Sequence, residues 1–393
     1  MRYWVYGDGS FTVMLGDLIA FAWLAPMRDL AAQIGMTDTG LRKLLKAQGV
    51  ILPEQGYWNK LRAGKLTPVL PKTPPRRPGE SQRIRLDGRF AGKVSPAPPI
   101  SAEGPFASIE VPEDLDALLD RERAAIGRVA VPRDLSKPAP GLRRLLQSEE
   151  RRRQRFAKSR YSWDAPLFDG PLAQRKLRIL NGLFHALHKR GCHGEVYEHQ
   201  YELQASVQVG EQCVRLSFST LSSYKTVMRH GRREPAEELS AGTPLKLSLH
   251  ITMRHKMQLS WSDTKDSRLE SCLSEVAAAI IVAGEAGYRA SLWEHIEMLE
   301  KRRRQEEAER QARIAEASAA RLAALKESGD LLRKAEDIRS LIARVKTAVE
   351  AGVRKVPPQQ LADWEAWANG YADSLDPVLS GHVLRHIAPS TPN

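Results

Sequence analysis

The chain has 393 residues, of which 42% are hydrophobic and 27% charged, so it can hold two or three domains with cores of their own. Its 60 Lys and Arg against 47 Asp and Glu give a formal charge of +13, which favours polyanionic partners, chiefly nucleic acid and less often an anionic membrane surface. Three widely spaced cysteines argue against a disulfide framework. With no secretory signal and no apolar run of bilayer length, we expect a cytoplasmic protein without a membrane partner.

Composition and periodicity predict an α+β multidomain protein made of six segments. We expect a small helical module at 1–65, a Pro/Arg-rich linker at 66–110, a basic helical segment at 111–165, a small antiparallel α+β domain at 166–290, charged coiled-coil-like helices at 291–352, and a short helix with a tail at 353–393.

The stretch from Pro26 to Lys65 predicts two short helices that meet at a Gly turn. The first covers Met27–Ile34, and Gly35 follows it, where a positive φ costs Gly little. The second covers Asp38–Gln48, with Thr37 or Asp38 as its N-cap. Its spacing turns the leucines inward and leaves these polar residues outward: Thr37, Thr39, Arg42, Lys43 and Lys46.

The spacing of Ala31, Gly35, Leu41 and Leu44 resembles the helix-turn-helix of bacterial DNA-binding proteins. The resemblance implies that the first helix crosses the backbone of double-stranded DNA and that the second enters the major groove. It also implies that Thr39, Arg42 and Lys43 reach base edges or phosphates. Gly40 departs from the usual pattern, because Gly weakens a helix by about 1 kcal/mol relative to Ala.

The following segment, "VILPEQGYWNKLRAGK", belongs to the same module and weakly resembles uncharacterised bacterial proteins that are often encoded by mobile elements. Tyr57 and Trp58 are placed to wedge against the helices, so that Lys60, Arg62 and Lys65 face a phosphate backbone. Simple hydrophobic closure of a small domain is the alternative reading of the two aromatic residues.

The linker is rich in Pro, Gly, Ser and Arg, a composition that buries no core and suits a semi-extended tether with one short strand at "RIRLDGRF". The segment after it predicts a helix in "PEDLDALLDRERAAIGRV" and ends in a basic run that is either a solvated helix face or a second phosphate contact. The auxiliary phosphate contacts predicted in these two segments are Arg76, Arg77, Arg151, Arg152, Arg153 and Arg155.

The 166–290 segment predicts a helix with Leu177, Leu180, Phe184 and Leu187 on one face, a hairpin that turns at Gly210, two more strands in "LKLSLHIT" and "MQLSWSD", and a second helix. After it, the pattern predicts a charged helix, a break at Ser328–Asp330, a second helix that stops near Gly352, and a third with Leu361, Trp364 and Trp367 on one face. An antiparallel helical hairpin with a docked tail would result.

Two clusters raise the question of chemistry, and neither predicts a catalytic or metal site. His185, His188, Cys192, His193 and His199 match no zinc spacing, so we favour ordinary histidines at a helix end. Asp263, Asp266 and Glu270 are an acidic cluster that a nuclease-like enzyme would use with Mg²⁺, but a strand-to-helix turn capped by Asp266 or Ser267 explains them. Without a Walker loop, a G-x-S-x-G or an HExxH motif, we expect no enzyme and no cofactor.

These features favour a bacterial double-stranded-DNA-binding protein, a transcriptional regulator or a mobile-element accessory factor. We expect a homo-oligomer, because one helix-turn-helix contacts few bases. The alternatives are a protein-interaction scaffold that uses its helical C-terminal region and, less favoured, a metal-dependent nuclease-like enzyme.

Overall fold

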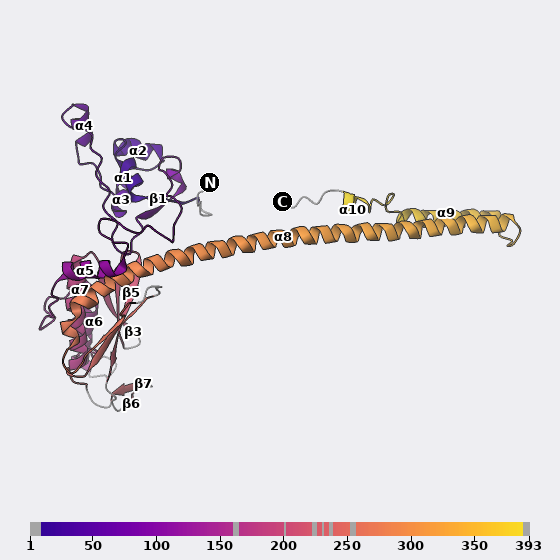
Figure 1. Cartoon of the computed structure of the whole chain (residues 1–393). Coiled ribbons are helices and arrows are strands. Elements are labelled where there is room, and N and C mark those ends of the chain that lie inside the picture. The colour runs from indigo at the N-terminus through magenta and orange to yellow at the C-terminus, as the bar shows by residue number, and fades with distance from the viewer. Residues whose placement is uncertain are drawn as a thin grey trace. The chain divides into compact units, whose positions relative to one another are not determined.

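The computed structural model describes residues 9–159, 165–199, 202–221, 226–229, 232–235, 239–251 and 257–387. Helices and antiparallel sheets are both present, which confirms the predicted α+β class. The chain divides into two compact units, Met1–Ile296 and Glu297–Asn393, and helix α8 begins in the first and ends in the second (Figure 1). In the described ranges, no helix combines the length and the apolar character that a bilayer span requires.

The N-terminal module is built on a strand pair that brings distant parts of the chain together. β1 (Phe11–Met14) pairs antiparallel with β2 (Arg83–Leu86), and helices pack on this pair. The helices are α1 (Leu15–Ala22), α2 (Met27–Gln33), α3 (Asp38–Ala47) and α4 (Tyr57–Arg62), and a 3₁₀ turn, Gly88–Phe90, follows β2.

The expectation that 66–110 is a coreless tether is therefore wrong. Ile84, Leu86, Phe90 and Val94 are buried in the same core as the first three helices. The pattern predicts only the short strand at "RIRLDGRF", and the partner of this strand lies in residues 11–14, inside the module for which the sequence predicts helices. A strand with two buried side chains needs a second strand to pair with, and here the second strand lies far away in the sequence.

The central domain is a five-stranded antiparallel sheet in the order β3-β4-β5-β8-β9, with helices packed on one face. The strands are β3 (His193–His199), β4 (Glu202–Val209), β5 (Gln212–Thr220), β8 (Leu245–His250) and β9 (Ser260–Ser262); β6 (Thr226–Arg229) and β7 (Arg232–Pro235) form a separate pair. The hairpin around Gly210 and the next two strands are confirmed, whereas β3 was not predicted because its polar, His-containing sequence alternates weakly.

Helix α7 (Pro171–Lys189) and the start of α8 cover the apolar face of this sheet. Leu177, Leu180, Phe184 and Leu187 are all buried there, as their spacing predicts. Helices α5 (Leu115–Ile126) and α6 (Arg143–Ser159) flank the domain, and a 3₁₀ turn, Pro140–Leu142, precedes α6. The 111–165 segment is not separate from the central domain, because the apolar side chains of α6 and its preceding turn join the domain core.

A buried carboxylate on α8 ties the linker to the central domain. Glu285 is fully buried and accepts two hydrogen bonds from the Arg76 guanidinium, at 2.8 and 2.9 Å, one from Arg289 Nε at 2.8 Å and one from the Gly79 amide at 2.8 Å. The Arg76 guanidinium also lies over the Tyr288 ring, 5.4 Å from its centroid. The predicted phosphate contact at Arg76 is therefore wrong, because its charge is already neutralised inside the protein.

The linker also contacts the β4–β5 turn, where the Ser81 amide donates to Glu211 Oε1 at 2.8 Å and two glycines bring the backbones together. The Glu211 amide donates to the Gly79 carbonyl at 2.8 Å. A Cβ on Gly79 would lie 2.3 Å from the Val209 carbonyl oxygen, and one on Gly210 would lie 2.4 Å from the carbonyl carbon of Gly79. No side chain fits at either position without moving one backbone away from the other.

The C-terminal unit is a helical hairpin, but it turns later than the sequence predicts. Helix α8 (Leu273–Glu350) runs without interruption through Ser328–Asp330, so the predicted break is wrong. A single Gly inside a helix costs only about 1 kcal/mol and is tolerated when the flanking turns pack. Ser328 is buried, and its hydroxyl lies 3.1 Å from Nε2 of His386 in α10 (Leu384–Ile387).

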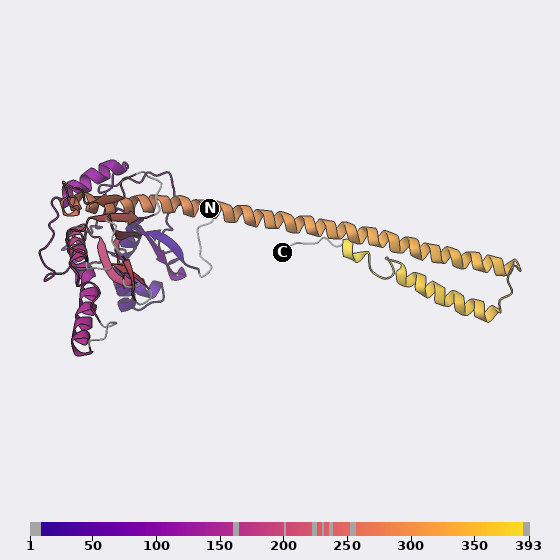
Figure 2. The ribbon, with the colours of Figure 1, turned by 90° about the horizontal axis from the view of Figure 1, so that it is seen from below.

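The second arm of the hairpin is α9 (Pro358–Leu375), which lies alongside the end of α8 in Figure 2. Arg339 of α8 pairs with Asp373 at 2.8 Å and with Asp376 at 2.9 Å. The helix end near Gly352 is confirmed. The predicted common face is wrong at Trp367, which is 69% exposed, because α9 buries Ala368 and Ala372 instead.

We predict that Glu285→Ala lowers the free energy of unfolding by about 3 kcal/mol or more, since removal of one partner leaves two arginines without a counter-charge. Urea titration would measure this loss, and limited proteolysis should cut the 66–113 segment earlier than in the unchanged protein. Glu103→Ala, which removes an exposed carboxylate from the same segment, is the matched control. Equal stability of the two variants would contradict the assignment of Glu285 as the anchor.

Candidate nucleic-acid interface

Helices α2 and α3 pack through small and branched apolar side chains around a Gly turn. Ala31 is 2% exposed, and Leu41 and Leu45 are fully buried in the module core. Gly35 lies between the helices with φ +65°, and the Met36 amide donates to the Ala31 carbonyl at 2.9 Å. The helix bounds, Met27–Gln33 and Asp38–Ala47, differ from the predicted ones by one residue at each C-terminus.

Gly40, the residue that departs from the usual pattern, has a local physical reason. Thr37 is the N-cap of α3, and its hydroxyl accepts a hydrogen bond from the Gly40 amide at 3.1 Å. A Cβ on Gly40 would lie 2.9 Å from that same hydroxyl oxygen, closer than ordinary contact allows. Gly40 therefore keeps the cap in place, which offsets part of its low helix propensity.

The outer face of α3 presents cations to solvent. Arg42, Lys43 and Lys46 are exposed, and none forms an ion pair or a side-chain hydrogen bond with another residue in the described part of the chain. Thr39 is exposed beside them, with its hydroxyl 3.4 Å from Asp38 Oδ1. The structure thus places four of the five predicted α3 residues with their polar groups accessible, while the Thr37 hydroxyl is used by the cap.

The segment after α3 is held by aromatic contacts. Trp23 Nε1 donates to the Ile51 carbonyl at 2.7 Å, and the Trp23 ring meets the Tyr57 ring edge-on at 4.9 Å between centroids. Tyr57 and Trp58 are likewise edge-on at 5.2 Å. These rings hold α4 against the end of α1, and they leave the following basic residues exposed: Lys60, Arg62 and Lys65.

The predicted auxiliary arginines on α6 divide into two groups. Arg152 lies 3.8 Å from Glu149, and Arg153 pairs with Asp169 at 2.8 Å and with Glu150. The hydrogen bonds that Arg153 donates to Asp169 raise the Arg153 pKa above its ordinary value. These two charges are therefore partly neutralised, although Arg153 is exposed like Arg151 and Arg155, and the phosphate contacts at these four arginines stay a prediction.

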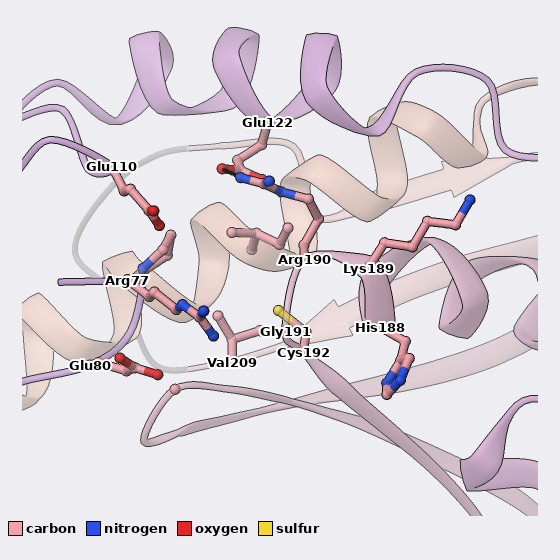
Figure 3. A pocket seen from close by; sticks show the side chains of 13 residues that line it. Arg77, Glu80, Glu110, Glu122, His188, Lys189, Arg190, Gly191, Cys192 and Val209 are labelled. Carbon is pink, nitrogen blue, oxygen red and sulfur yellow. Dashed lines mark hydrogen bonds and ion pairs between the residues drawn. The ribbon is translucent and has the colours of Figure 1, made fainter. Parts of the chain in front are cut away.

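Arg77 lines a cavity of about 260 Å³ where the linker meets α5, the end of α7 and the β4–β5 turn (Figure 3). Acidic and basic side chains are mixed there: Glu80 and Glu110 lie near Arg77, and Arg190 makes two 2.8 Å hydrogen bonds to Glu122. Burial raises the Glu80 pKa. A cavity with such balanced charge does not favour an anionic ligand. Arg77 therefore differs from the cations of α3, which are exposed and, among the residues that the structure describes, have no acidic neighbours of this kind.

The histidine-rich stretch is spread over two elements. His185 and His188 lie on α7, and His193 and His199 lie at the two ends of β3. The His188 and His193 rings meet edge-on at the end of α7, 5.8 Å between centroids, whereas the strand places His199 at its far end. The His185 ring lies 3.1 Å from the Lys137 carbonyl. Among the described residues, no three His, Cys, Asp or Glu side chains converge in a way that could hold a metal ion.

The acidic cluster is engaged by a buried arginine. Arg175 pairs with Asp263 at 2.8 Å and with Glu270 at 2.7 Å. Burial alone would raise the pKa of both carboxyls, but the hydrogen bonds from Arg175 outweigh it and lower them. The predicted cap at Asp266 or Ser267 is wrong, because Asp263 Oδ1 accepts from the Leu269 amide instead, at 2.8 Å, where a 3₁₀ turn, Leu269–Ser271, precedes α8.

Comparisons of the chain with protein-family models, with curated proteins and with solved structures find no match.

We predict that the effect of Gly40→Ala on the stability of α3 depends on whether Thr37 is present. In the unchanged protein, the added methyl group displaces the capping hydroxyl, so the usual gain of about 1 kcal/mol for Gly→Ala is lost. In a Thr37→Ala background, which itself costs about 1 kcal/mol, the gain should reappear. Hydrogen exchange of the α3 amides in the four proteins of this double-mutant cycle measures the coupling, and strictly additive effects would contradict it.

We predict that the Cys192 thiol is inert in the native protein. Burial raises its pKa to about 12, so at pH 8 only about one molecule in ten thousand carries the reactive thiolate. The exposed Cys213 provides the internal control. Iodoacetamide at pH 8 with mass spectrometry should modify Cys213 and leave Cys192 unmodified until the protein is denatured; equal rates in the native protein would refute this.

Proposed function

We propose that the protein binds double-stranded DNA through a helix-turn-helix formed by α2 and α3. The observation that supports it is the set of exposed cations on α3, Arg42, Lys43 and Lys46, which have no partner in the described ranges. A carboxylate three or four residues away on a helix can pair with a basic side chain, but Asp38, four residues before Arg42, makes no ion pair with it in the described ranges. The buried leucines on the opposite side of α3 hold this face outward on a rigid support.

In this proposal, α3 enters the major groove and α2 crosses the backbone. Thr39 and Arg42, near the N-terminus of α3, reach base edges, and Lys43 and Lys46 contact phosphates. Lys60, Arg62 and Lys65 on and after α4 extend the contact along the backbone. Two copies of the chain act together, because one such module contacts only a few base pairs.

Fluorescence anisotropy with duplex DNA over a salt series tests the proposal. Each phosphate contact makes the slope of log K against log salt steeper by about 0.9, so Arg42→Ala with Lys43→Ala should flatten the slope by about 1.8 if both touch phosphate. If Arg42 reads a base instead, the affinity should fall by about 10- to 100-fold, with a smaller change of slope.

Arg354→Ala with Lys355→Ala is the matched control, since it also removes an adjacent, exposed Arg–Lys pair, but from the turn between α8 and α9. This variant should bind duplex DNA with an unchanged salt slope. If both double variants retain full affinity, α3 is not the DNA-binding element.

A further inference from the structure

The central sheet has a second face that the helices do not cover. Helices α7 and α8 bury the side chains that alternate inward, such as Val214, Leu216 and Leu247. The strand register places the intervening residues together on the other face. An open face of an antiparallel sheet is ordinarily polar, so polarity alone indicates nothing.

The charges on this face are separated by strand. On β5, β8 and β9 the outward residues carry no carboxylate and no large apolar side chain; they are Cys213, Arg215, Ser217, Ser219, Lys246, Ser248, His250, Ser260 and Ser262. The acidic residues of the face, Glu195 and Glu202, lie on β3 and β4. One half of the face is therefore positive and rich in hydroxyl groups.

Among the described residues, Arg215 and Lys246 have no ion-pair partner. Arg215 is exposed and Lys246 is half-buried, and neither makes an ion pair or a side-chain hydrogen bond with another described residue. Arg215 lies directly opposite His250, and Lys246 lies opposite Ser219 and Ser262. Each set of opposite residues forms a row across the strands. The row between that of Arg215 and that of Lys246 consists of three serines, Ser217, Ser248 and Ser260.

A hollow of about 510 Å³ opens beside Arg215 and His250, walled by α8 at Gly287, Ser291 and Glu294. Its volume suits a phosphorylated sugar, not a double helix. The His250 Nε2 atom lies 2.6 Å from the Ser217 hydroxyl, so the ring is held at the edge of this hollow.

We propose that the β5–β8–β9 half of the open sheet face binds the phosphate backbone of single-stranded nucleic acid. Arg215 and His250 hold one phosphate at the hollow, the serine row donates hydrogen bonds, and Lys246 holds another phosphate about 13 Å further along the strands, four residues away. A spread of this length exceeds a single phosphate, which favours a polynucleotide over free phosphate.

This site is distinct from the face of α3, and the two proposals fail separately. Anisotropy with a labelled single-stranded oligonucleotide over a salt series tests it in the full chain. Arg215→Gln with Lys246→Gln should weaken binding about tenfold and flatten the salt slope by about 1.4, while duplex affinity stays unchanged. Arg42→Ala with Lys43→Ala should weaken duplex binding and leave single-strand affinity unchanged.

Arg354→Gln with Lys355→Gln is the matched control, and Arg215→Lys should retain the slope because it keeps the charge. Arg215→Gln and Lys246→Gln are also measured singly, so that the proposal can still be tested if the double variant does not fold. Unchanged single-strand affinity would overturn the proposal. It would also fail if duplex binding fell equally, or if inorganic phosphate bound in an Arg215-dependent way while the oligonucleotide did not bind.

Discussion

The carboxylate of Glu285 is the group on which the arrangement of the first unit depends. It lies fully buried on α8, where an isolated charge would be too costly to keep. Arg76 and Arg289 neutralise it, and each arginine also donates to backbone carbonyls of the 66–113 segment. The same group therefore fixes a segment whose composition suggests a loose tether, so that α3 and the central sheet belong to one compact unit.

Local patterns in the sequence predicted local structure well. The bounds of α2 and α3, the hairpin at Gly210 and the buried face of α7 follow from spacing, capping and turn residues, which act over a few positions. Some local patterns misled, such as the helix break expected at Ser328–Asp330, but the errors about tertiary structure concern partners that lie far apart in the sequence. β1 and β2 are separated by most of the module, and Arg76 and Glu285 by 209 positions, so no local pattern could pair them.

The same division applies to the candidate sites. Helical spacing predicted which cations of α3 face outward, and strand alternation shows which residues of β5 and β8 face away from the core. Whether an arginine is available depends instead on what lies nearby in space. Arg151, Arg152 and Arg153 are adjacent and chemically identical, yet carboxylates of Glu149, Glu150 and Asp169 engage two of them. A count of basic residues cannot make that distinction.

The contact of Gly79 with Gly210 constrains how the chain can change. At most interfaces, a larger residue on one side can be compensated by a smaller residue on the other, so that both positions can vary. Here both sides already have the smallest residue, and the surfaces in contact are backbone. No second substitution can compensate for a first, so this junction is either kept intact or lost, while the surrounding side chains remain free to vary.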